Sequence, residues 1–138
     1  MEFGQIGIGI RNLELALATF QRWGRNVTPT WVHAAEQVAP GAGTALVTRL
    51  VTAGKTGYIY GFFISAGEGN NFLINWTSGA VARSIRIPLT GAGALHFADF
   101  ISLNEGLGAD GGTNITITNV SAGGAGIIYQ ARLLYAEV

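Results

Sequence analysis

The sequence lacks cysteine, and it carries about half the charge of an ordinary soluble domain. Of its 138 residues, 12% are charged, whereas an average domain has about 25%. The absence of cysteine excludes a disulfide scaffold and a thiolate metal site. The 8 Lys and Arg residues balance the 8 Asp and Glu residues, so the basic excess of a free nucleic-acid-binding protein is missing. We expect no direct contact with nucleic acid.

Long apolar runs and a basic leader are also missing. Arg11 and Glu14 interrupt the apolar stretch at residues 3–20, and no run approaches the ~20 apolar residues that a transmembrane helix needs. Glu2 is the only early charge, whereas a secretory signal begins with a basic region. We therefore expect no membrane association and no export.

The low charge content favours a protein that assembles. The surfaces of well-behaved small domains carry ~25–35% charged residues, so this chain has sparse polar coverage. Apolar surface left uncovered in this way tends to be buried against other chains. We expect a homo-oligomer.

The chain divides into an N-terminal assembly segment at residues 1–40 and a β-domain at residues 41–138. The first ten residues contain a period-2 apolar pattern typical of an extended arm. Asn12 can cap a helix from Leu13 to Trp23, which Gly24 would end. The apolar side chains that we expect to contact a neighbouring subunit are Phe3, Ile6, Ile8, Leu13, Leu17, Phe20, Trp23 and Trp31.

From Thr44 onward, stretches rich in Val, Ile, Thr, Tyr and Phe alternate with Gly-rich turns, the pattern of antiparallel strands. The spacing leaves no room for crossover helices. The sequence therefore predicts an all-β antiparallel sandwich of seven or eight strands in a jelly-roll-like arrangement. The predicted strands are Ala45–Thr52, Tyr58–Ser65, Phe72–Trp76, Ala82–Pro88, Ala94–Leu103, Asn114–Val120 and Ile127–Ala136.

Residues for catalysis are scarce. His33 and His96 are the only histidines, and residues 96 and 99 of a strand point to opposite faces, so His96 and Asp99 should not form an acid–base pair. The Gly-x-Ser-x-Gly signature of a nucleophile elbow is absent. We expect no enzyme activity and no cofactor.

Two weaker binding patterns remain open. Glu105, Asp110 and Asn114 offer the oxygen ligands that calcium prefers, although their spacing matches no EF-hand loop. Trp76 with nearby aromatic residues could form a platform for sugars. The period-2 set of Tyr58, Tyr60 and Phe62 is more simply explained as one face of a strand, buried in the core or in a subunit interface.

Four Asn-x-Ser/Thr sequences occur, at Asn26, Asn75, Asn114 and Asn119. They are glycosylation acceptors only in an exported chain. Thr-rich strands with Asn at their ends produce the same pattern, which is the interpretation we prefer.

Two motifs resemble small β-sandwich proteins encoded by tailed phages and related viruses. The first is the turn Ala53-Gly54-Lys55-Thr56, which leads into the strand Tyr58-Ile59-Tyr60-Gly61-Phe62-Phe63-Ile64-Ser65-Ala66-Gly67. The second is the stretch from Phe97 to Gly106. The resemblance covers about residues 44–138. It implies a jelly-roll-like virion component that decorates or lines a capsid and is often trimeric, and it carries over no catalytic residues.

The combined expectation is a viral structural protein, a self-assembling capsid or capsid-decoration subunit. It would form a homo-oligomer, with a trimer favoured, contact another virion shell protein, and be assembled in the host cytoplasm. One alternative is an extracellular filament subunit joined by donor-strand exchange of the N-terminal arm. A second is a carbohydrate- or calcium-binding β-sandwich module.

Overall fold

The computed structural model describes residues 28–98 and 108–138. The predicted arm, the predicted helix and seven of the expected contact residues, from Phe3 to Trp23, lie outside these ranges. So does Glu105 of the calcium candidate.

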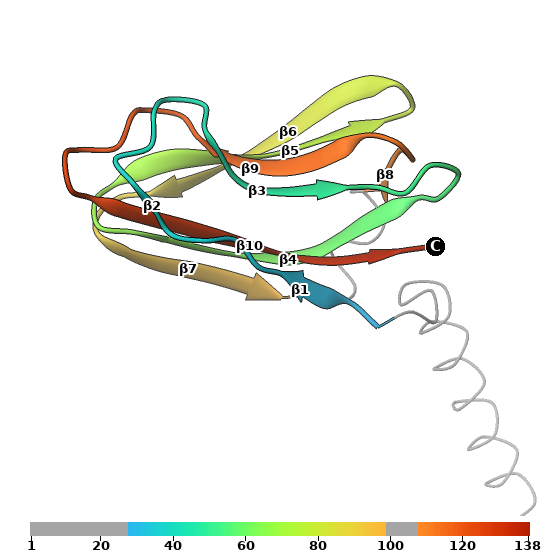
Figure 1. Cartoon of the computed structure of the whole chain (residues 1–138), viewed down its shortest axis with the longest axis horizontal. Helices are drawn as coiled ribbons and strands as arrows, with labels where there is room; N and C mark the ends of the chain where they lie inside the picture. Colours follow the sequence, from blue (N-terminus) through green and yellow to red (C-terminus); the bar gives the residue numbers. More distant parts are fainter. Residues whose placement is uncertain (1–27, 99–107) are drawn as a thin grey trace, which may run out of the picture.

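The described residues form ten strands, and the seven predicted from the sequence are confirmed in position (Figure 1). The last predicted residues of one strand, 99–103, lie outside the described ranges. The strands are β1 (Thr30–Val32), β2 (Gln37–Val38), β3 (Ala45–Leu50), β4 (Gly57–Ala66), β5 (Asn70–Ser78), β6 (Val81–Leu89), β7 (Gly93–Ala98), β8 (Gly108–Ala109), β9 (Asn114–Asn119) and β10 (Ile128–Glu137).

Two antiparallel sheets lie face to face, as Figure 1 shows. Sheet A has the order β1-β10-β4-β7, with β2 also pairing with β10 and β8 with β4. Sheet B has the order β3-β9-β5-β6. The strand pairs are nested along the chain, because β1 pairs with β10, β3 with β9, β4 with β7 and β5 with β6. The predicted all-β sandwich is therefore observed.

Strands β1, β2 and β8 were not predicted. Each has two or three residues, too few to show an alternating pattern. In β1, Trp31 pairs with Leu134 and Val32 with Leu133. Residues 30–32 and 37–38, which the sequence placed in the assembly segment, thus pair with β10 of the same chain.

The core fills the space between the sheets. Ile59, Phe72 and Tyr129 are fully buried there, so apolar and aromatic side chains from both sheets interdigitate. The other large core residues are Leu46, Val51, Ile64, Ile74, Ile115, Ile117 and Leu133.

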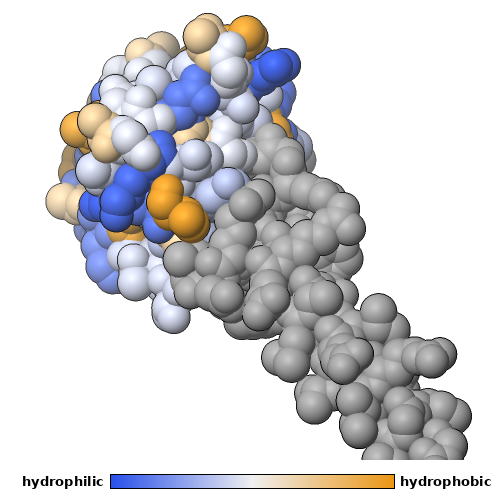
Figure 2. Space-filling view, turned by 90° about the vertical axis from the view of Figure 1, so that its right-hand side faces the viewer, coloured by the Kyte–Doolittle hydropathy of each residue, from blue (hydrophilic) through white to orange (hydrophobic). Residues whose placement is uncertain are grey.

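Large exposed apolar residues are dispersed over the surface. In the view of Figure 2, hydrophobic areas are separated by hydrophilic ones. The large exposed apolar residues are Val38, Leu50, Val81, Ile85, Ile128 and Val138.

Within the described ranges, no helix is long and apolar enough to cross a membrane.

Candidate functional site

The aromatic residues expected on one face of β4 are divided between two faces. In the pairing of β4 with β10, Leu134 is opposite Gly61 and Tyr135 is opposite Ile59, so Tyr60 is an extra residue. Such a β-bulge interrupts the alternation of side chains. The prediction of a single face containing Tyr58, Tyr60 and Phe62 was therefore wrong.

Tyr58 and Tyr60 lie on the outward face of sheet A, in a buried cluster with Leu134 and Ala136. Trp31 packs against the same cluster from β1. Two of the expected contact residues in β4 and the one in β1 are thus brought together.

Phe62 takes the opposite direction. It packs against the core between the sheets, and its ring stacks on Phe97 with 5.9 Å between centroids. Phe97 is its direct partner on β7. Phe62 therefore packs the core on the side of the sandwich where β7 lies.

Next to this cluster, a shallow hollow of about 180 Å³ opens on the outward face of sheet A. Its lining comes from four neighbouring strands of the sheet: Trp31 of β1, Arg132 of β10, Phe63 of β4 and His96 of β7. We refer to these four residues as the sheet A hollow. The ring centroids of Trp31 and His96 are 5.6 Å apart.

The sheet A hollow could not be predicted from the sequence because its residues are spread from position 31 to position 132. The period-2 pattern of β7 and β10 places His96 and Arg132 on a known face of each strand. Only the strand order and register bring the two faces together, and no local pattern encodes that order.

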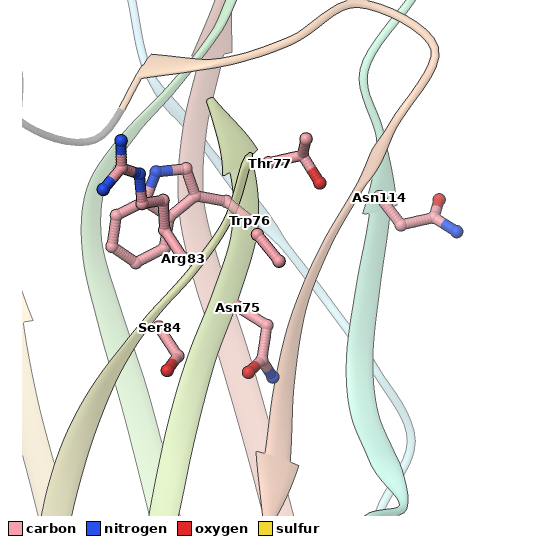
Figure 3. A pocket seen from close by; sticks show the side chains of 7 residues that line it. Asn75, Trp76, Thr77, Arg83, Ser84 and Asn114 are labelled. Atoms are coloured by element: carbon pink, nitrogen blue, oxygen red, sulfur yellow. The ribbon is translucent and has the colours of Figure 1, made fainter. Parts of the chain in front are cut away.

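Trp76, the candidate sugar platform, is buried. Only 6% of its surface is exposed, and it belongs to the core between the sheets. A pocket of about 250 Å³ opens beside it, where the cross-strand partner Arg83 lies next to the indole (Figure 3). Figure 3 also shows the Asn114 amide pointing away from the other lining side chains. Trp76 therefore offers no open aromatic face to a sugar.

Asp110, the central residue of the calcium candidate, binds the turn between β5 and β6. Its carboxylate accepts hydrogen bonds from the backbone N–H groups of Gly79 (3.0 Å) and Ala80 (2.7 Å). These bonds lower the pKa of Asp110, the Ala80 bond most strongly. Both turn residues have positive φ, 59° for Gly79 and 61° for Ala80, as in a type I′ hairpin.

Positive φ is unfavourable for alanine, so the Asp110 carboxylate stabilises a strained turn. Asn114 is an exposed residue at the start of β9, opposite Leu50. In the described ranges, no three His, Asp or Glu side chains are grouped so that they could hold a metal ion.

A second carboxylate joins the C-terminal strand to the loop after β3. Glu137 accepts hydrogen bonds from the backbone N–H of Thr52 (3.1 Å), from its hydroxyl (2.6 Å) and from the Tyr135 hydroxyl (2.5 Å). The Thr52 hydroxyl is the main cause that lowers the pKa of Glu137 to about 2. Burial, followed by the bond to Glu137, raises the pKa of Tyr135 to about 12.

A third carboxylate, Glu68, performs the same kind of task at the opposite end of β10. It accepts hydrogen bonds from the Gly124 N–H (2.6 Å) and the Tyr129 hydroxyl (2.9 Å). The bond from Gly124, followed by that from Tyr129, lowers the pKa of Glu68. All three carboxylates thus tie loops to strands, which is a structural use of charge.

Three of the four sequons, at Asn75, Asn114 and Asn119, lie in strands of sheet B, and Asn26 lies outside the described residues. Asn119 is fully buried, and its amide donates to the carbonyls of Gly41 and Ser121. The Asn75 amide donates to the hydroxyls of Thr116 and Thr118 on the neighbouring strand. A glycan on Asn119 is incompatible with this packing.

No family model, no curated protein and no solved structure matches the chain.

Proposed function

We propose that the chain is a non-catalytic structural subunit that assembles with copies of itself through a jelly-roll sandwich. In a jelly roll, an antiparallel ribbon of strands is rolled into two sheets, so the strand pairs are nested along the chain. The nested pairs observed here, β1 with β10, β3 with β9, β4 with β7 and β5 with β6, support that topology. Jelly rolls are used in viral capsids, lectin domains and cupins.

The interior favours the first of these uses. Ile59, Phe72 and Tyr129 have no exposed surface and fill the space between the sheets. A ligand site between the sheets would need to displace them. The burial of Trp76 likewise disfavours a sugar platform at that position.

The observation that carries the proposal is the free edge of β6. This strand pairs with β5 over its nine residues, and its other edge is unpaired within the described part of the chain. Its first six residues are exposed, including Val81 (50%) and Ile85 (39%). A long free edge with apolar side chains is a template for pairing with another strand.

The other edge strand of sheet B is less suitable for pairing. β3 has six residues, and its register with β9 shifts between Ala45 and Val47. A bulge of this kind protects an edge from further pairing. We therefore assign the contact to β6.

The matching strand in our proposal is the N-terminal arm that the sequence predicts. Phe3, Ile6 and Ile8 give it apolar side chains that could extend a sheet, and strand addition derives affinity from backbone hydrogen bonds. In our proposal the arm of one copy pairs with β6 of the next. This contact is heterologous, so it forms a closed ring, with a trimer expected, or an open filament.

We further propose that this assembly is part of a virion, with the capsid shell protein as its second partner, and the resemblance to phage-encoded sandwich proteins supports this. The turn residues of the first motif have structural roles. Gly54 adopts positive φ in the turn, and Lys55 N–H bonds to the Thr52 carbonyl at 3.1 Å. The resemblance therefore concerns the sandwich and supports no separate activity.

The molar mass of the full chain in solution, measured by size exclusion with light scattering, tests the proposal. We expect a closed oligomer, and we expect Ile85→Lys to convert it to a monomer because a charge on an edge strand opposes pairing. Leu50→Lys is the matched control, since Leu50 is 58% exposed on the opposite edge of the same sheet. A monomeric wild-type chain, or equal effects of the two variants, would contradict the proposal. Open-ended polymers would indicate the filament.

A further inference from the structure

The sheet A hollow combines a cation with three aromatic rings on an outward face. Arg132 lies between Trp31 and Phe63 in the strand order, and His96 closes the far side. The hollow has about 180 Å³. Dry cavities of about 150 Å³ accept a benzene ring, so one ring with a small substituent fits here.

Arg132 has no anionic partner among the described residues. Its guanidinium carbon lies 5.8 Å from the centroid of the Phe63 ring. Its Nε is buried and has no hydrogen-bond acceptor in the described ranges. Because no described carboxylate lies beside the guanidinium, its positive charge is available to an added anion, which would bind at the terminal N–H groups.

Arg49 provides an internal comparison. It also lies over an aromatic ring, 5.0 Å from the centroid of Tyr135. However, Glu137 hydrogen-bonds to the same tyrosine, and the charge of Arg49 contributes to lowering the pKa of Glu137. Nε of Arg49 is also buried without an acceptor in the described ranges, so the two arginines differ only in having a carboxylate nearby, which is Glu137 for Arg49 and is absent among the described residues for Arg132.

The aromatic walls add a preference for shape. The Trp31 and His96 rings are tilted by 35° to each other, and Phe63 lies 6.4 Å from His96 between centroids. Flat apolar surfaces stack on such rings, whereas a small inorganic anion uses only the arginine. Arginine binds a carboxylate through two parallel hydrogen bonds.

We propose that the sheet A hollow binds a ring that bears a carboxylate, with the carboxylate on Arg132 and the face of the ring on Trp31. The ring can come from an acidic sugar or from an aromatic acid, which share this chemistry. The four lining residues belong to one chain, so the site is independent of the proposed assembly.

Isothermal titration calorimetry of the full chain with D-glucuronate, benzoate and uncharged D-glucose tests this inference. We expect saturable binding of at least one of the two acids, and no binding of glucose. Binding of glucuronate alone identifies a sugar acid, and binding of benzoate alone identifies an aromatic acid. Failure of both acids, or equal binding of glucose, would overturn the proposal.

Variants locate the binding. Arg132→Gln should lower the association constant about tenfold or more, the effect of losing a charge-assisted bond. Trp31→Phe should lower it less, because an aromatic face remains. Lys55→Gln is the control, since Lys55 is an exposed cation in the turn between β3 and β4, away from the hollow lining and from β6. Binding that persists in a folded Arg132→Gln variant, or that Lys55→Gln weakens equally, would refute the site.

Discussion

Gly61 is the residue at which the bulge in β4 meets β7, and Gly61→Ala should be strongly destabilising. A Cβ atom at this position would lie 2.2 Å from the carbonyl oxygen of Phe97 and 2.8 Å from the Cα of Ala98. Carbon–oxygen contacts are ordinarily about 3.3–3.6 Å. The backbone of β7 would therefore move by about 1 Å, since neither atom belongs to a flexible side chain.

The magnitude follows from the kind of atom that must move. Overpacking a core costs typically ~1–3 kcal/mol, and a shift of paired backbone belongs at the upper end, so we expect a loss of about 3 kcal/mol. For a domain of this size, each kcal/mol changes the melting temperature by roughly 3–4 °C. The expected decrease is then about 10 °C.

Urea unfolding followed by circular dichroism measures the effect as a lower midpoint at unchanged slope. All samples need one protein concentration, because assembly adds concentration-dependent stability. Gly91→Ala is the control, since a Cβ there meets no atom within 4 Å, and the change should lie within about 0.5 kcal/mol. If Gly61→Ala and Gly91→Ala unfold alike, β7 does not lie against β4 as described, and the sheet A hollow loses His96.

Two further predictions concern the carboxylates. Because the folded pKa of Glu137 is lowered to about 2 from 4.5, its contribution to stability is complete above pH ~4.5 and is lost as the pH falls toward 2. In the Glu137→Gln variant, the midpoint of urea unfolding should depend less on pH over this acidic range. A residual pH dependence should remain, because the pKa values of Glu68 and Asp110 are also lowered. A pH dependence equal to that of the wild type would contradict the hydrogen-bond network of Glu137. Asp110→Ala should lower the thermal midpoint more than Asp110→Asn, which keeps one acceptor oxygen, and excess calcium should leave the wild-type midpoint unchanged. A clear rise with calcium would restore the metal-site interpretation.

The strands of the sandwich were predictable because their signals are local. In β5, the large apolar residues Phe72, Ile74 and Trp76 recur at every second position and all three are buried, as the period of a strand predicts. The Gly-rich turns then mark where each strand ends. Strand order, by contrast, depends on contacts far apart in the chain, such as Trp31 with Leu134.

The functional surfaces were harder to predict because each depends on an irregularity. In the sequence, large apolar residues occupy every second position from Tyr58 to Ile64 without a break. Only the pairing with Leu134 and Tyr135 shows that Tyr60 is a bulged residue. Asp110 was a calcium candidate because its carboxylate, together with Glu105 and Asn114, offers the oxygen ligands that calcium prefers. Its real partners, the N–H groups of Gly79 and Ala80, lie thirty residues away.

The low charge content of the chain does not correspond to a single exposed apolar patch on the described surface. On the outward face of sheet B, short polar side chains take the place of charges, as where Asn75 bonds to Thr116 and Thr118. Some of the charges are used within the fold, with Glu68 and Glu137 holding loops against strands. Low charge therefore does not locate an interface by itself. The interface that we propose rests instead on the edge of β6, which is unpaired among the described residues and offers backbone groups and the apolar side chain of Ile85 to a second strand.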